Sequence, residues 1–259
     1  MLGTDFITDI ALFSLPLDPP FLAFPGNDET ASALRTICEA VAKATCRLLQ
    51  IEAGEILAEY RPALTDAGAI GHEVEIFVYD TLAGGAGFSP QLAAEGEQLF
   101  AEALNILTGC PASCDTSCYR CLRSYRNKIE HRLLDRKLGE QLLRHALYGG
   151  YADYPADRAE ASLGLLYADL ERNLPEGFVA SRNARRQAGS RETTIPIVIA
   201  RQAGGNETWI DLSSPVAPGV PVSAGLRAAG IAERVLCIDD LLIRRNLPRA
   251  VETVRDGLR

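Results

Sequence analysis

The stretch Gly109–Asn127, GCPASCDTSCYRCLRSYRN, holds four cysteines in the pattern C-x3-C-x3-C-x2-C: Cys110, Cys114, Cys118 and Cys121. Four thiolates this close together are typical of one tetrahedral Zn2+, and the C-x2-C half has the spacing of a zinc knuckle. An iron–sulfur cluster, a disulfide or free thiols are the alternatives. A zinc ion with four thiolate ligands leaves no open position for water, so the site is predicted to be structural.

The other three cysteines are scattered along the chain. Cys38 lies in the apolar stripe of a predicted helix and Cys46 at its edge, which indicates core thiols rather than metal ligands. His131 lies ten residues after Cys121 and could replace a thiolate, but four cysteines make this unnecessary.

Length and composition predict a soluble, cytoplasmic protein with its own hydrophobic core. The chain has 259 residues, 47% of them hydrophobic, so the metal is expected to organise only a local module. The N-terminus does not have the basic region of a signal peptide. No apolar run is long enough to span a membrane, and no membrane partner is expected.

Charge is distributed unevenly along the chain, whose formal net charge is −8. Residues 1–109 contain 4 Lys and Arg against 16 Asp and Glu, residues 110–148 contain 8 against 4, and residues 149–259 contain 14 of each. The cysteine segment is therefore a basic island beside an acidic body, and this is where an anionic partner is expected to bind.

Hydrophobic periodicity predicts an α/β fold. Predicted strands span residues 6–15, 73–80, 193–200, 208–212 and 235–239. Predicted helices span residues 27–50, 89–107, 129–147 and 156–172, with a last one from 241, and loops cover 62–71 and 213–225. We expect a mixed sheet flanked by helices over residues 1–148, with the four-cysteine zinc module inserted at 110–128. A smaller C-terminal α/β extension is expected over 149–259, after the linker Gly149-Gly150.

A glycine-rich turn joins the strand at 73–80 to the next helix. Gly84, Gly85 and Gly87 could present backbone N–H groups to a phosphate. The chain contains neither G-x-G-x-x-G nor G-x4-G-K-[ST], so a tight turn with close strand–helix packing is the favoured interpretation. Asp80 is either a cap of this turn or a site carboxylate.

Cations and aromatic residues surround the C-x2-C knuckle. The predicted nucleic-acid contacts are Arg120, Arg123, Arg126, Lys128, Arg132, Tyr119 and Tyr125. Guanidinium groups suit phosphates, and tyrosines offer faces for the bases of a single strand. Alternatively, these cations neutralise the thiolate centre and pair with the acidic N-terminal body, or they bind a protein. Asn127 and Asp135 are expected to cap or pin the module.

These motifs together resemble a known family. The matching stretches are Thr8–Ile10 (TDI), Tyr79–Phe88 (YDTLAGGAGF), Cys110–Asn127, His131 and Leu134–Arg136 (LDR). Their order resembles the helicase-associated zinc-binding domain, domain of unknown function number 1998, over about residues 1–148. The family includes MrfA-type DNA-repair helicases and the DrmB protein of the DISARM phage-defence system, and SCYRCLRSYRN is most similar to the DrmB-like branch.

The chain departs from MrfA-type proteins because it has no Walker A loop and no DEAD/DEAH box. The resemblance therefore implies a helicase subunit supplied in trans. The chain is also shorter than a typical DrmB protein, which suggests a split subunit, a fragment or a free-standing version.

No catalytic motif is found. His72, His131 and His145 lie outside H-x-K-x4-D and H-E-x-x-H patterns, and Asp135-Arg136-Lys137 falls on a predicted helix rather than a strand. We expect a non-catalytic zinc-binding accessory subunit of a helicase-containing DNA-processing complex in bacterial antiphage defence or DNA repair, in contact with single-stranded or branched DNA. The alternatives are a stand-alone nucleic-acid-binding zinc module and an enzyme that holds a nucleotide at Gly84–Gly87.

Overall fold

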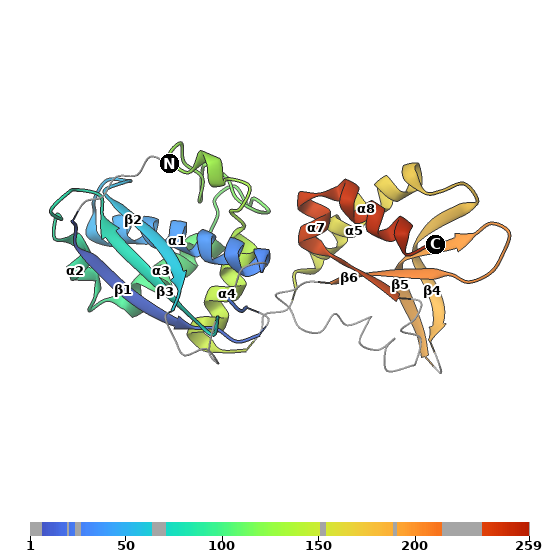
Figure 1. Ribbon diagram of the computed structural model, residues 1–259, viewed down its shortest axis with the longest axis horizontal. Helices are drawn as coiled ribbons and strands as arrows, with labels where there is room; N and C mark the ends of the chain where they lie inside the picture. Colours follow the sequence, from blue (N-terminus) through green and yellow to red (C-terminus); the bar gives the residue numbers. More distant parts are fainter. Residues whose placement is uncertain are drawn as a thin grey trace. The chain divides into compact units, whose positions relative to one another are not determined.

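The structure is a computed structural model that describes residues 7–19, 21–23, 27–63, 71–150, 154–188, 191–213 and 235–258, with the backbone alone at 188 and 191. The chain divides into two units, Met1–Ala152 and Asp153–Arg259 (Figure 1). Each unit combines one sheet with helices, which confirms the predicted α/β class. Across these described ranges, no helix is long and apolar enough to cross a membrane.

The first unit is built on a three-stranded antiparallel sheet in the order β1-β3-β2. The strands are β1 (Ile10–Pro16), β2 (Ile56–Pro62) and β3 (Glu73–Asp80). Buried and half-buried residues alternate along β3, because one face of the sheet lies against helices. The strands predicted at 6–15 and 73–80 are confirmed from Ile10 onwards, whereas β2 was not predicted.

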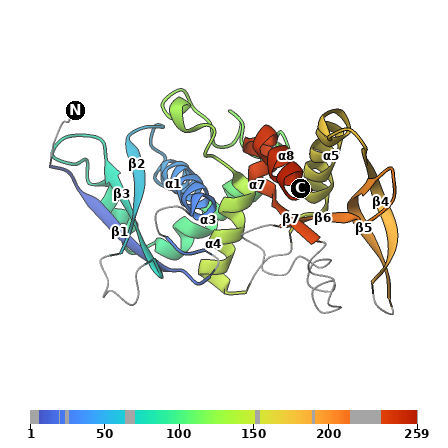
Figure 2. The same ribbon diagram turned by 45° about the vertical axis from the view of Figure 1, so that its right-hand side comes forward.

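Three helices lie on one side of this sheet, as Figures 1 and 2 show: α1 (Asp28–Leu49), α3 (Gly96–Thr108) and α4 (Arg136–Tyr148). Asn27 caps the start of helix α1, because its side chain accepts a hydrogen bond from the N–H of Thr30. Leu34, Ile37 and Cys38 of its predicted apolar stripe are fully buried, whereas Leu48 at its end is half-buried. The core of this unit therefore forms between α1 and the sheet.

Two helix predictions in this unit were wrong in their extent. The helix predicted at 89–107 is two helices, α2 (Phe88–Leu92) and α3, separated by a short turn. The helix predicted at 129–147 begins only at Arg136, because the Asp135 side chain accepts hydrogen bonds from the N–H groups of Lys137 and Leu138. Before it, Lys128–Glu130 forms a single 3-10 turn.

The second unit contains a four-stranded mixed sheet in the order β4-β5-β6-β7. The strands are β4 (Phe178–Ala188), β5 (Arg191–Arg201), β6 (Thr208–Ser213) and β7 (Val235–Asp239). The β4–β5 and β5–β6 pairs are antiparallel, and the β6–β7 pair is parallel. Helices α5 (Ala156–Asn173), α7 (Asp240–Arg245) and α8 (Leu247–Asp256) share an apolar core with the sheet. The predicted strands at 193–200, 208–212 and 235–239 are confirmed, whereas β4 was not predicted. The predicted loops at 62–71 and 213–225 lie largely outside the described residues.

Candidate metal centre and its basic surroundings

The four predicted cysteine ligands converge in the first unit. Neighbouring sulfurs lie 3.5 Å (Cys110–Cys114), 3.7 Å (Cys110–Cys118), 3.6 Å (Cys114–Cys121) and 3.7 Å (Cys118–Cys121) apart, and all four lie within 4.8 Å of one another. These distances are too long for a disulfide, whose S–S bond is about 2.05 Å. The side chains therefore enclose one small tetrahedral space.

This space fits a single zinc ion. Four sulfurs about 2.3 Å from one tetrahedral metal lie about 3.8 Å from each other. A cluster with two or more irons separates its cysteines further, since iron and sulfide atoms lie between them. Zn2+ is thus the cofactor that the donor set supports, and Cys110, Cys114, Cys118 and Cys121 would hold it in a closed, structural site.

Local backbone hydrogen bonds shape the knuckle. The N–H groups of Cys121, Leu122 and Arg123 all donate to the carbonyl oxygen of Cys118, at 3.1, 3.1 and 2.9 Å. The N–H of Cys118 donates to the Cys121 sulfur at 3.2 Å. Although burial raises it, the pKa of Cys110 is lowered to about 6 by backbone hydrogen bonds from Cys114 and Ala112. Burial and the neighbouring sulfurs raise the pKa of Cys114, and burial raises that of Cys121, so among these three thiols only Cys110 is shifted towards thiolate.

Two cations from outside the knuckle hold the backbone around the cysteines. The Lys43 ammonium, on α1, donates to the carbonyl oxygen of Cys121. The buried Arg136 guanidinium, at the start of α4, donates to the carbonyl oxygens of Cys114 at 2.6 Å and Leu107 at 3.0 Å. The local sequence does not indicate this role for either residue. Arg136 belongs to the quoted LDR motif, whereas nothing near Lys43 in the sequence indicates its place.

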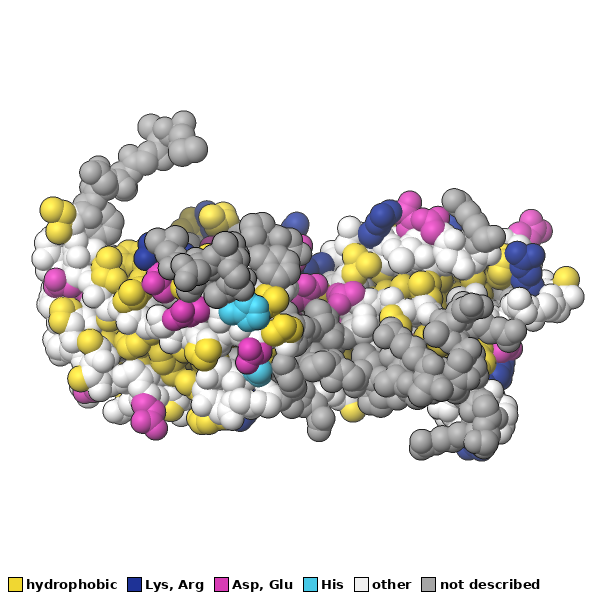
Figure 3. Space-filling view, turned by 60° about the horizontal axis from the view of Figure 1, so that its bottom comes forward, with side chains coloured by type: hydrophobic (Ala, Val, Ile, Leu, Met, Phe, Trp, Pro, Cys, Tyr) yellow, Lys and Arg dark blue, Asp and Glu magenta, His cyan; other side chains and the backbone are white. Residues whose placement is uncertain are grey.

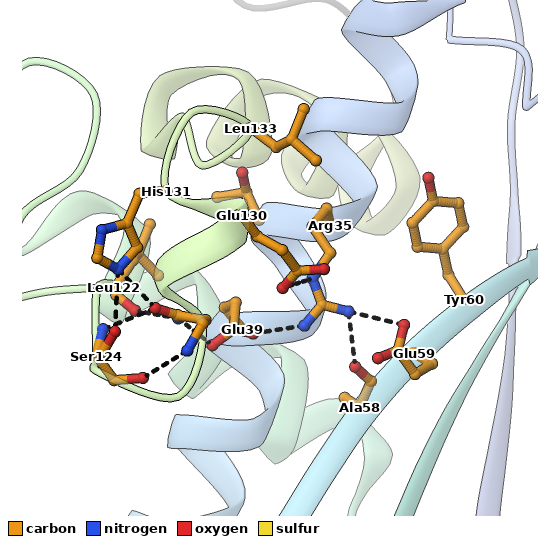
Figure 4. A network of polar contacts seen from close by, with 12 residues as sticks. Arg35, Glu39, Ala58, Glu59, Tyr60, Leu122, Ser124, Glu130, His131 and Leu133 are labelled. Atoms are coloured by element: carbon orange, nitrogen blue, oxygen red, sulfur yellow. Dashed lines mark hydrogen bonds and ion pairs between the residues drawn. The ribbon is translucent and has the colours of Figure 1, made fainter. Parts of the chain in front are cut away.

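Asn127 pins the module to the body, as predicted. Its side-chain amide donates to Glu39 on α1 at 2.7 Å and to the Leu122 carbonyl oxygen at 3.0 Å, and its oxygen accepts from the N–H of Ser124 at 2.8 Å. His131 Nε2 lies 3.0 Å from the Asn127 oxygen and 3.0 Å from the Ser124 carbonyl oxygen (Figure 4). His131 thus belongs to this network and is not one of the grouped metal ligands.

The network continues to a buried arginine. Arg35 forms ion pairs with Glu39, with Glu59 at 2.7 Å and with Glu130 at 3.0 Å, so that α1, β2 and the 3-10 turn are joined (Figure 4). Burial raises the pKa of Glu130, and the neighbouring Arg35 opposes that rise. These carboxylates are therefore occupied by an internal partner.

The predicted cations of the basic island are not neutralised in the same way. Within the part of the chain that the structure describes, none of the five cations Arg120, Arg123, Arg126, Lys128 and Arg132 forms an ion pair with a carboxylate. Arg123 donates to the Ser117 hydroxyl at 2.9 Å, and Lys128 lies 4.6 Å from the centre of the Tyr125 ring. The alternative in which these cations pair with the acidic body is thus not what the structure contains.

The acidic body itself offers few cations on one of its faces. Figure 3 shows Asp and Glu side chains scattered among hydrophobic ones on the N-terminal unit, with some Lys and Arg side chains between them. This agrees with the composition of residues 1–109, which contain 4 Lys and Arg against 16 Asp and Glu. Lysine and arginine are therefore scarce in residues 1–109 and more frequent in residues 110–148, which contain 8.

The glycine-rich turn binds an internal carboxylate. The Asp80 side chain is fully buried and accepts hydrogen bonds from the N–H groups of Ala86 (2.7 Å), Phe88 (3.1 Å) and Ser89 (2.9 Å), and from the Ser89 hydroxyl. Burial opposes ionisation, but these hydrogen bonds lower the pKa of Asp80. Gly85 has a φ of +79°, and a Cβ there would lie 2.2 Å from the Asp9 carboxylate. The structure thus favours the interpretation of Gly84, Gly85 and Gly87 as a tight turn.

Comparisons with known proteins agree with this zinc site. Residues 37–122 match the model of the MrfA Zn-binding domain, a match that begins in α1 and ends directly after Cys121. The predicted resemblance to the helicase-associated zinc-binding domain is thereby confirmed for this region. The narrower similarity to the DrmB-like branch stays a prediction.

Two individual proteins are similar to parts of the chain. The Druantia protein DruE of Escherichia coli (strain UMEA 4076-1) is 37% identical over 155 residues, which are 57% of this chain and 8% of that protein. The crystal structure of the DUF1998 helicase MrfA bound to DNA superposes with a TM-score of 0.34 at 17% identity, covering 47% of this chain and 15% of that one. The chain therefore corresponds to only a small part of each relative.

Proposed function

We propose that the chain is a non-catalytic, zinc-binding accessory component of a helicase-containing DNA-processing complex in bacterial antiphage defence or DNA repair. The observation that carries the proposal is the closed four-cysteine site inside a match to the MrfA Zn-binding domain. The similarity to the Druantia protein DruE supports the same proposal. These 259 residues contain no motor motif, so the proposal places the helicase activity outside them.

The proposed role of the metal is to build a surface. Four thiolates saturate a tetrahedral zinc ion, so the metal has no free position at which to activate water. It instead fixes the loop that carries Tyr119, Arg120 and Arg126. Because the cations of this loop have no carboxylate partner among the described residues, they support contact with the DNA backbone.

Co-purification from the native host tests the accessory role. The tagged chain is expected to recover a helicase, and elemental analysis of the same sample is expected to give about one zinc ion per chain. The Cys118→Ser variant serves as the matched control, since it removes one ligand and leaves the acidic body unchanged. Recovery of no helicase under mild salt would contradict the proposal.

A second candidate is a stand-alone nucleic-acid-binding zinc module. The same cations, which have no carboxylate partner among the described residues, favour it, and it differs from the first proposal only in needing no partner. Salt-sensitive DNA binding by the isolated chain, without any recovered helicase, would favour this candidate.

A further inference from the structure

A groove with a volume of about 740 Å3 lies against the zinc module. One wall is the module itself, with Tyr119, Arg120, Tyr125 and Arg126. The opposite wall consists of residues of α1 and of the turn that leads into β2, including Gly54. Ligand clefts in proteins typically measure about 300 to 1,000 Å3, so the groove is large enough for a specific ligand.

The charges of the groove favour an anion. Its carboxylates, Glu39, Glu59 and Glu130, all form ion pairs with Arg35. Arg120 and Arg126 line the same groove, and neither pairs with a carboxylate among the residues that the structure describes. Arg35 offsets one of these three negative charges, and the other cations of the lining, Lys43, Arg47, Arg120 and Arg126, make the groove net positive.

Arg126 is already positioned across the groove. Its Nη1 donates a hydrogen bond of 3.2 Å to the carbonyl oxygen of Gly54 on the opposite wall. Gly54 has a φ of +97°, and a Cβ there would lie 2.2 Å from this nitrogen, so glycine makes room for the guanidinium. A phosphate oxygen is a stronger acceptor for an arginine than a neutral carbonyl oxygen. Because the Arg126 side chain is already held in place, binding a phosphate would cost it little further conformational entropy.

The two tyrosines supply apolar surfaces beside these cations. The exposed fractions are 68% for Tyr119 and 77% for Tyr125, which is unusual for large aromatic side chains. His131 meets the Tyr119 ring edge-on, with ring centres 5.4 Å apart, and Lys128 lies over Tyr125. Aromatic rings next to guanidinium groups that have no carboxylate partner in the described part of the chain match the alternation of bases and phosphates in an unpaired strand.

We propose that this groove binds single-stranded nucleic acid, with bases stacked on Tyr119 and Tyr125 and phosphates bound by Arg120 and Arg126. This inference deepens the proposed function, on which it rests, by assigning the ligand class and the surface. Stacking requires exposed base faces, so a duplex fits the groove poorly. Since one wall is the zinc module, binding also requires the metal.

Fluorescence anisotropy with a labelled oligothymidylate, and with a duplex of the same length, tests the stacking. Tyr119→Ala together with Tyr125→Ala is expected to weaken binding of the single strand by about tenfold or more. The Tyr119→Phe, Tyr125→Phe double variant retains the rings and is expected to bind as the wild type does. Tyr148→Ala removes a tyrosine that is also 68% exposed but lies on α4 outside the groove lining, and it is the matched control.

The cations are tested through salt dependence. Arg120→Ala with Arg126→Ala is expected to reduce the slope of log affinity against log salt by about 1.4, since each phosphate contact of a single strand contributes about 0.7. Arg144→Ala is the control, because Arg144 pairs with Glu140 away from the groove. Zinc content measured on every variant identifies any that has lost the module.

The outcomes separate the two proposals. Equal affinity for duplex and single strand, or full binding by the tyrosine-to-alanine variant with zinc retained, would overturn the groove assignment. A chain that recovers a helicase but shows no groove-dependent binding overturns the groove alone. A chain that binds the single strand through the groove yet recovers no helicase overturns the accessory role alone.

Discussion

The segment from Cys110 to Asn127 contains no helix or strand, whereas the described residues of the second unit surround an apolar core with a sheet and the helices α5, α7 and α8. The first is fixed by four thiolates and by polar contacts from α1 and α4. The second is fixed by leucine, isoleucine and valine side chains such as Leu166, Ile210 and Val254. A short loop with few apolar residues therefore depends on a metal, while a unit with a core does not.

Removing a metal ligand should separate the two regions most strongly. Cys118→Ser is expected to release the zinc and disorder residues 110–128, since structural zinc contributes about 10 to 16 kcal/mol to small zinc modules. The second unit should keep its protection in hydrogen exchange, as should α1 apart from its contacts with the module. Elemental analysis and hydrogen exchange with mass spectrometry measure both. Cys237→Ser, outside the cluster, should retain the metal, and zinc loss in that control would contradict the assignment.

A cavity in the apolar core of the second unit should destabilise that unit and leave the zinc site intact. Leu166 is fully buried, so Leu166→Ala is expected to lower the free energy of unfolding of this unit by about 2 to 5 kcal/mol. Zinc content should not change. The neighbouring Leu165, 49% exposed, gives the control Leu165→Ala, with an effect expected within about 0.5 kcal/mol. Thermal melts followed by hydrogen exchange in each unit show which one has been destabilised.

The carboxylate in the glycine-rich turn predicts a dependence on pH. Asp80→Asn should lower the free energy of unfolding by about 2 kcal/mol, because a charged acceptor of several hydrogen bonds is lost. The pKa of Asp80 is lowered by folding, so its contribution is complete above the unfolded value and disappears as the pH falls through the folded value. The stability gap between wild type and variant should thus be constant near neutral pH and narrow below about pH 4. A gap that widens in acid would contradict this account.

The smallest expected effect concerns the start of α4. Asp135→Ala removes the N-cap and should lower the free energy of unfolding of the first unit by about 1 kcal/mol. Asp135→Ser, which restores a capping oxygen, should recover most of this loss. Chemical denaturation of the three proteins gives the comparison, and equal midpoints for Ala and Ser would show that capping is not the cause.

Much of the fold could be predicted from local sequence patterns, and the predictions that failed did so for local reasons. Helix α1 and strands β3 and β7 were predicted closely because their apolar periodicity continues to a clear cap or turn. Helix α4 was predicted too early, since Ile129 and Leu133 look like part of its stripe but are exposed. Strand β4 was not predicted because its arginines make the segment resemble a polar loop. The strand is held in place by its pairing with β5.

The sequence by itself determined the ligand set. Four cysteines within one short loop lie close together, because the spacing alone limits how far apart the sulfurs can be. The sulfur separations in the structure then favour one zinc ion over a disulfide or a cluster. Only the tertiary structure decided which cations serve the metal and which face a ligand. Lys43 reaches Cys121 across 78 residues, and Asn127 reaches Glu39 across 88. Such contacts depend on how α1 packs beside the module, and no local spacing encodes that packing.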